Sequence, residues 1–204
     1  MPRMPPKSSR DVFLNIPYDK KFENLCLAYV SGISAFGLNP RATLEIPGGA
    51  RRLDRIFRLI QSCPYSVHDL SRVELDRTRP RTPRFNMPFE LGMCVAWATI
   101  GGSKHEWFAF ESMDRRLAKS LSDLNGTDPY IHRGTVAGVL RELCNAFVRS
   151  RPKPTIQQMW AIYRDVRKGL PTILRQAGAR SIYNARVFKD ICVAAITTAD
   201  VRVM

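Results

Sequence analysis

The stretch DVFLNIPYDKKFENLCLAYVSGISAFGLNPRATLEI, residues 11–46, decides the fold class. It opens with a short apolar run over 11–16 that is rich in strand-forming residues and ends at Pro17. Apolar residues then recur every three or four positions from Lys20 to Phe36, which predicts a helix that stops at Gly37. A second apolar run over 41–46 predicts another strand. The stretch therefore indicates a strand–helix–strand unit.

The same alternation continues to about residue 150. Further helices are expected at about 50–62, 86–98, 113–124 and 134–148, and further strands at 65–68, 106–110 and 129–132. Strands that alternate with helices predict a parallel sheet with helices on both faces. Five strands favour a flavodoxin-like α/β layout.

Three regions are expected along the chain. Residues 1–10 are basic and Pro-rich and are predicted to form a disordered tail. Residues 11–150 form the α/β domain, and two prolines, Pro152 and Pro154, mark its end. Residues 151–204 are predicted to be a helical annex. This annex is too small to bury a core alone, so we expect it to pack on the main domain or on a second copy in a homo-oligomer.

Composition limits the class of protein and the cellular compartment that we expect. Of 204 residues, 45% are hydrophobic and 25% charged, the balance of a globular chain. No apolar run is long enough to span a membrane and no signal-peptide core follows the tail, so a cytoplasmic protein without membrane contact is expected. The five cysteines never approach a metal-binding spacing, which predicts reduced thiols and no metal site.

The net charge of +14 points to an anionic partner. Residues 151–204 hold ten Lys/Arg against three Asp/Glu, and five arginines lie between Arg72 and Arg84. Such an excess attracts nucleic acid, an acidic protein or a phosphorylated small molecule. A solvated basic surface without a partner explains it equally well.

Two loops are the first places to search for a site. Parallel sheets of this kind bind ligands outside the carboxyl ends of their strands, where the strand order reverses. The loops after the first and third strands carry Tyr18-Asp19 and His68-Asp69. An aspartate at a strand end more often forms a turn than acts in catalysis, and a histidine there is more often packed than a base.

The segment Asn86-Met-Pro-Phe-Glu90-Leu-Gly92 opens the third helix. Asn86 is predicted to cap the helix, and Pro88 is tolerated in a first turn. Glu90 then lies on the edge of the apolar face, where the positive end of the helix is expected to keep it ionised. A glutamate near a helix start also occurs for stability alone. No serine-protease triad, HExxH zinc motif or phosphate-binding P-loop is present.

Three of these motifs together resemble a known superfamily. A first strand ending in Ile16-Pro-Tyr-Asp19, a third ending in His68-Asp69, and Asn86-Met-Pro-Phe-Glu-Leu-Gly92 at a helix start are similar to the superfamily that joins nucleoside 2-deoxyribosyltransferases to prokaryotic TIR-like domains. The resemblance covers about residues 11–150. It implies that Glu90 is the catalytic carboxylate that attacks or stabilises the anomeric carbon of a ribosyl group as its N-glycosidic bond breaks.

The resemblance also implies roles for neighbouring residues. Asp69 would contact the ribose or the leaving base as a second catalytic group, and Tyr18 and Asp19 would line the pocket with His68 and Asn86. The deoxyribosyltransferases usually have an acid and a Gly-Thr pair shortly before the glutamate, where this chain has Arg84-Phe-Asn86. This difference favours the TIR-like branch, which cleaves NAD or related nucleotides, and Arg84 would suit a phosphate of such a ligand.

The sequence therefore predicts an enzyme that cleaves or transfers at the ribosyl–base bond of a small nucleotide or nucleoside. NAD enters as a candidate substrate, and no cofactor is expected. Two alternatives remain open. One is a non-catalytic module of the same fold that binds a nucleotide or a protein. The other is a nucleic-acid-associated protein whose basic annex binds weakly and without sequence preference.

Overall fold

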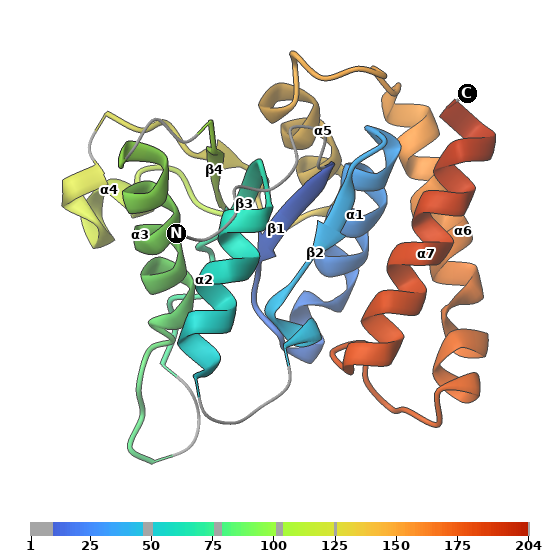
Figure 1. Cartoon of the computed structure of the whole chain (residues 1–204), viewed down its shortest axis with the longest axis horizontal. Helices are drawn as coiled ribbons and strands as arrows, with labels where there is room; N and C mark the ends of the chain where they lie inside the picture. Colours follow the sequence, from blue (N-terminus) through green and yellow to red (C-terminus); the bar gives the residue numbers. More distant parts are fainter. Residues whose placement is uncertain (1–9, 47–50, 76–78, 101–103, 125, 204) are drawn as a thin grey trace.

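A computed structural model of the chain describes residues 10–46, 51–75, 79–100, 104–124 and 126–203. Five parallel strands form one sheet in the order β2-β1-β3-β4-β5 (Figure 1). Their bounds are Asp11–Asn15 (β1), Asn39–Arg41 (β2), Tyr65–Asp69 (β3), Glu106–Glu111 (β4) and Tyr130–Ile131 (β5). This is the order of a flavodoxin-like sheet, and it confirms the predicted fold class. The expected tail lies outside the described residues except for Arg10.

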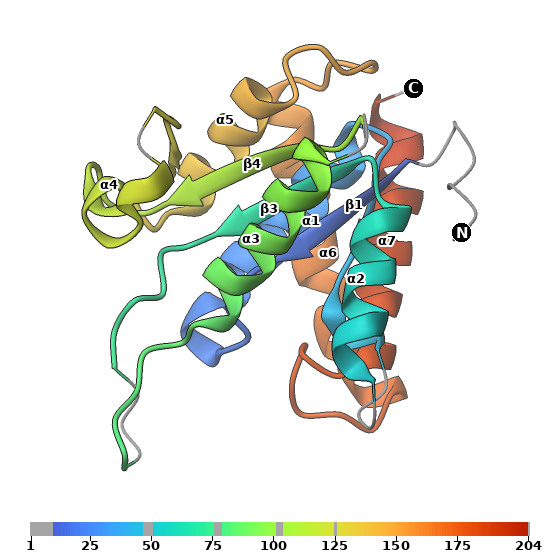
Figure 2. The same cartoon turned by 60° about the vertical axis from the view of Figure 1, so that its left-hand side comes forward.

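Helices cover both faces of the sheet. They are α1 (Glu23–Ala35), α2 (Arg52–Ser62), α3 (Asn86–Thr99), α4 (Arg116–Ser120), α5 (Val136–Ala146), α6 (Ile156–Gln176) and α7 (Ala185–Val203). Helices α2 and α3 lie on one face, and α1 lies on the other (Figure 2). The alternation of β1 agrees, because Val12 and Leu14 pack in the cluster that contains α1, whereas Phe13 packs with α2 and with Cys94 of α3.

Two predicted elements differ from the structure. The strand expected over 41–46 ends at Arg41, and Thr43–Glu45 form a 3-10 helix, η2. The Glu45 carboxylate accepts a hydrogen bond from the backbone N–H of Ala42 at 2.9 Å, and this bond favours the turn over an extended chain. The helix expected over 113–124 is divided into α4 and the 3-10 helix η3 (Ser122–Leu124), and Arg115 before α4 has a left-handed φ of 61° that no right-handed helix accommodates.

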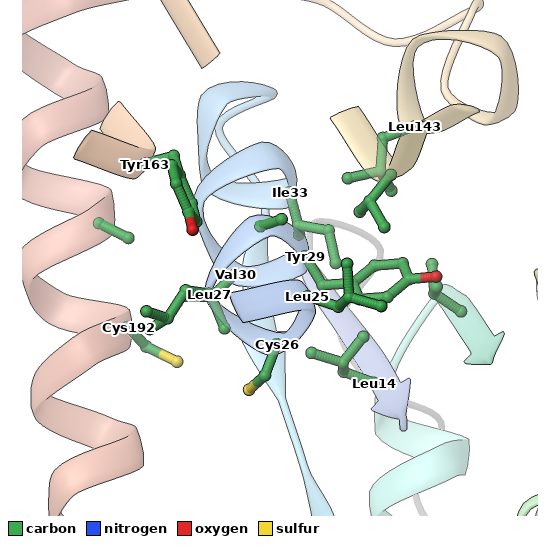
Figure 3. Close-up of a cluster of buried hydrophobic side chains, with 14 of the residues drawn as sticks. Leu14, Leu25, Cys26, Leu27, Tyr29, Val30, Ile33, Leu143, Tyr163 and Cys192 are labelled. Carbon is green, nitrogen blue, oxygen red and sulfur yellow. The ribbon is translucent and has the colours of Figure 1, made fainter. Parts of the chain in front are cut away.

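The annex forms the two helices α6 and α7, as expected, and both helices pack on α1. Buried side chains of α6 and α7 belong to the same hydrophobic cluster as those of β1 and α1. Figure 3 shows Tyr163 and Cys192 on one side of α1 and Leu14 on the other. Helix α1 is therefore covered on all sides, with every residue from Leu25 to Ala35 buried.

The annex also supports the loop that follows β1. The Tyr183 hydroxyl donates a hydrogen bond to the backbone carbonyl of Asp19 at 2.8 Å, and the rings of Tyr183 and Tyr18 lie 5.4 Å apart. Another short turn, η1 (Lys20–Phe22), follows at this point and leads into α1. The annex thus holds part of the edge where ligands of this fold bind. No described helix has both the length and the apolarity that a membrane crossing requires.

Candidate functional site

A cavity of about 370 Å³ lies between the carboxyl end of β1 and the first turns of α2 and α3. Its polar lining comes from Asn15, Tyr18, Thr43, Arg52, Arg84, Asn86 and Glu90. Ile16, Leu53, Ile56, Met87 and Phe89 supply most of its apolar wall. Its place beside β1 is where strand order reverses in the 2-1-3-4-5 sheet, so the cavity coincides with the expected ligand position. A wider hollow of about 660 Å³ lies between α6 and α7, away from the strand ends, and it has no cluster of titratable groups beyond the Arg202–Asp165 pair.

Glu90 lies in the second turn of α3, with only 9% of its surface exposed. Burial raises the pKa of its carboxyl to about 7, and the nearby charge of Arg52 lowers it only in part. Among the described residues, no hydrogen bond or ion pair joins the carboxylate to another group. The helix end was expected to keep Glu90 ionised, but burial outweighs it and leaves the carboxyl only partly ionised near neutral pH. A carboxyl with a pKa near neutrality can act as base, nucleophile or acid.

Tyr18 and Asp19 follow β1, as expected. Tyr18 lines the cavity, and its hydroxyl shares a hydrogen bond of 3.0 Å with the Thr43 hydroxyl. Burial raises the pKa of Tyr18, so the phenol stays protonated. Asp19 is outside the cavity lining. Its carboxylate accepts from the backbone N–H of Lys21 and pairs with Arg72 at 3.0 Å, so it organises the loop.

His68 is fully buried under α3 and does not line the cavity. Its Nδ1 lies 2.9 Å from the Asn15 amide nitrogen, and its Nε2 lies 2.9 Å from the Ser66 hydroxyl. Burial, with the neighbouring His105, lowers the pKa of His68 to about 3. The ring is therefore neutral at physiological pH, and both of its nitrogens already have partners.

Asp69 lies on the opposite face of the sheet from Glu90. Successive side chains of β3 alternate, so Asp69 points toward α1 while His68 points toward α3. One oxygen of Asp69 accepts from the Tyr29 hydroxyl at 2.7 Å and lies 3.1 Å from His132 Nε2. The other accepts from Ser71. Burial alone would raise the pKa of Asp69, but these donors hold it below its usual value. Asp69 stabilises the core and is not brought to the cavity.

Asn86 and Arg84 reach the mouth of the cavity with exposed side chains. Asn86 is the first residue of α3 rather than its cap. Phe85 holds the cap position and makes no side-chain hydrogen bond there. Arg84 lines this cavity and also a neighbouring apolar one of about 240 Å³. Phe85 and Phe89 are 66% and 56% exposed beside it.

Asn15 and Arg52 also line the cavity but were not predicted from the sequence. Asn15 is the last residue of β1, 3% exposed, and its amide nitrogen donates to the backbone carbonyl of Met87 at 2.8 Å. Arg52 opens α2, and its guanidinium donates to the carbonyl of Ile46 at 2.9 Å. The available signal was a polar residue at the carboxyl end of an otherwise apolar strand, which is where this fold places its ligand contacts.

Within the described residues, no cluster of three or more His, Cys, Asp or Glu side chains could hold a metal ion, and all five cysteines are free thiols. Fold and site together define a flavodoxin-like α/β domain with a buried glutamate in a cavity at the switch point of its sheet. Comparison of the chain with protein-family models, curated proteins and solved structures returned no match. The resemblance drawn from the motifs thus stays a prediction.

Proposed function

We propose that this chain is an enzyme that cleaves or transfers at the N-glycosidic bond of a nucleotide, with hydrolysis of NAD or a related nucleotide favoured over deoxyribosyl transfer. The observation that carries the proposal is the position of Glu90. Its carboxyl is buried in the cavity at the switch point of the sheet, and no described group pairs with it. A fold that needed this glutamate only for stability would be expected to pair it or leave it in water.

The proposed chemistry uses one carboxylate. As the bond between the anomeric carbon and the base nitrogen breaks, its electron pair leaves with the base and positive charge develops on the sugar. The Glu90 carboxylate stabilises or captures this charge, and water or a second nucleoside base then takes the sugar. Two exposed arginines at the mouth of the cavity, Arg52 and Arg84, are placed to bind the phosphate of the ligand.

The surroundings of Glu90 favour a cationic leaving base. A neutral base needs a proton from a second group, and His68 and Asp69 were the candidates. His68 has a pKa of about 3 and Asp69 is ionised on the other face of the sheet, so neither supplies that proton. Nicotinamide in NAD is already cationic and leaves without protonation. This supports the glycohydrolase over the deoxyribosyltransferase.

The test is release of free base. Purified protein is incubated with NAD and with a panel of nucleosides and nucleoside monophosphates, and the products are separated by chromatography. We expect base release from the wild type and a loss of at least a hundred-fold in Glu90→Gln, since the reacting carboxylate is gone. Glu142→Gln is the matched control. It removes a half-buried helical glutamate, on α5, that lies outside the cavity.

The pH profile identifies the active form of Glu90. If the carboxylate acts ionised on a cationic base, kcat/KM rises with pH through about 7, the pKa of Glu90 in the free protein. A fall through the same range would assign Glu90 as the acid. Base release that persists in Glu90→Gln would contradict the proposal. If no substrate of the panel reacts but ligand binding is retained, the non-catalytic binding module replaces it.

A further inference from the structure

We propose that Asn15 selects the sugar, its amide oxygen accepting a hydrogen bond from the 2-hydroxyl of a ribosyl group. This inference depends on the proposed function, since it names the sugar class that the same cavity takes. It assigns Asn15 as a specificity-determining residue that holds the hydroxyl next to the anomeric carbon. A 2-deoxyribosyl group lacks this donor and would leave the oxygen unpaired.

The orientation of the Asn15 amide follows from its two partners. The amide nitrogen lies 2.8 Å from the backbone carbonyl of Met87, which can only accept. It also lies 2.9 Å from Nδ1 of His68. Both amide hydrogens are therefore used beneath the cavity. Because Asn15 lines the cavity and no described group donates to its oxygen, the oxygen is what it presents to a ligand.

A chain of buried hydrogen bonds fixes the same orientation from the other side. His105 Nδ1 lies 2.8 Å from the Cys63 carbonyl, so this nitrogen carries the proton and Nε2 accepts. Ser66 then donates to His105 Nε2 at 2.8 Å and accepts from His68 Nε2. His68 Nδ1 is left with a lone pair, which only the amide N–H₂ of Asn15 can satisfy. Rotation of the amide by 180° would set oxygen against two acceptors.

The rest of the cavity complements a sugar phosphate. Two buried groups of its lining, the Asn15 oxygen and the Glu90 carboxylate, are acceptors that match hydroxyls. The cations stand at the exposed mouth. Arg52 is held there by the carbonyls of Ile46 and Thr43 and keeps its charge unpaired with any described acid, and Arg84 is exposed beside it. A pentose inserted with its hydroxyls inward leaves its 5-phosphate at these arginines.

Asn15 also positions the reacting carboxyl. Its bond to the Met87 carbonyl ties the first turn of α3 to the end of β1, and Glu90 follows Met87 by three residues on the same side of the helix. A variant at Asn15 would therefore disturb both the sugar contact and the placement of Glu90. For this reason, the test compares two sugars in each variant, because general damage weakens both equally.

The experiment is calorimetric titration with ribose 5-phosphate, 2-deoxyribose 5-phosphate and inorganic phosphate, none of which carries a base that could be cleaved. We expect the wild type to bind ribose 5-phosphate roughly ten-fold more tightly than the deoxy sugar, the effect of one hydrogen bond. Asn15→Ala should remove this preference. Asn15→Ser, whose shorter hydroxyl cannot reach the same point, should remove it as well, and Asn145→Ala, at an exposed asparagine on α5, should leave it unchanged.

The outcomes separate this inference from the proposed function. Equal preference in Asn15→Ala and wild type overturns the role of Asn15, while the activity of Glu90 is judged by base release alone. Equal binding of inorganic phosphate and both sugars, or binding of none, also overturns it. Melting temperatures identify a variant that fails to fold. If Asn15→Ala does not fold, the preference measured in Asn15→Ser decides, because serine offers a shorter hydroxyl that cannot reach the same point.

Discussion

Ionisation of Glu90 costs free energy in this fold, because the carboxyl is buried. Its folded pKa of about 7 lies above the ordinary value of 4.5, so the protonated form is the one that the folded state favours. The contribution of this group to stability is then fully present below pH 4.5 and is lost as the pH rises through 7. A shift of this size corresponds to about 3 kcal/mol at most. Retaining such a group is typical of a functional site.

Replacement of Glu90 by glutamine should therefore stabilise the protein at alkaline pH. Glutamine keeps the shape without the buried charge. We expect Glu90→Gln to raise the free energy of unfolding at pH 8 by about 1–3 kcal/mol, with the gain shrinking below pH 7 and absent near pH 4.5. Urea unfolding at several pH values measures it. A loss of stability in Glu90→Gln at pH 8 would indicate an ion pair to Glu90.

At the scale of single residues, the sequence predicted some of the residues that line the cavity, but not the hydrogen-bond partners of the predicted residues. Glu90 and Tyr18 were found because they stand at a helix start and after a strand, and both line the cavity. His68 and Asp69 were grouped with them because they lie at the carboxyl end of the third predicted strand. Adjacent residues in a strand point to opposite faces, so the strand that brings His68 under α3 directs Asp69 to Tyr29. Hydrogen-bond partners of this kind leave no local sequence pattern.

At the scale of elements, α1 carries the main departure from an amphipathic surface helix. The sequence has no charged residue between Glu23 and Arg41, and both sides of the helix are covered. Gly32 marks the closest approach. A methyl group there would lie 2.5 Å from Leu143 Cδ1, 3.1 Å from Met159 Cε and 3.3 Å from Leu140 Cδ2, all fully buried side chains. The small residue allows α5 and α6 to pack on α1.

We expect Gly32→Ala to destabilise the protein by about 1–2 kcal/mol, because overpacking of the core exceeds the gain in helix propensity. Gly169→Ala is the matched control. Gly169 lies inside α6 with no atom within 4 Å of an added methyl group, so alanine should stabilise the helix by up to about 1 kcal/mol. Thermal unfolding of both variants measures the opposite shifts. A stabilised Gly32→Ala would mean that α1 packs less closely than described.

The order of the elements was predictable from hydrophobic periodicity, because each strand and helix carries its own repeat. The ends of the strands and helices were less predictable than their order. The strand expected over 41–46 became β2 and η2 through a single side-chain bond from Glu45 to the Ala42 backbone. The annex was expected on the main domain or on a second copy, and the uncharged surface of α1 is the feature that favoured the first. The sequence carries this feature only as a stretch without charged residues, which no motif marks.

At the scale of the whole molecule, burial and charge distinguish two ways in which the annex could bind nucleic acid, by charge and by stacking on bases. Among the aromatic residues of the annex that could stack on bases, Tyr163 and Phe188 are buried in the core at 3% and 1% exposure. Tyr183 is engaged with Asp19 and Tyr18. Trp160 is half-buried against Tyr163. The annex therefore offers positive charge to a polyanion but few aromatic surfaces for stacking.

The annex should consequently bind single-stranded DNA only through its charge. Without stacking, affinity comes from the release of counterions by Lys and Arg, which falls by orders of magnitude between about 50 and 200 mM salt. We expect micromolar binding at low salt, little dependence on base sequence, and no measurable binding at about 200 mM salt. Fluorescence anisotropy with labelled oligonucleotides of several sequences measures this.

Ala substitution of Arg164, Arg167 and Lys168, three cations on α6 with exposed side chains, should lower the salt slope, whereas Trp160→Phe should not. Nanomolar affinity that survives 200 mM salt would require base contacts, and the exposed Phe85 and Phe89 beside Arg84 would then be the residues to examine, because they are the exposed aromatic side chains next to the cavity.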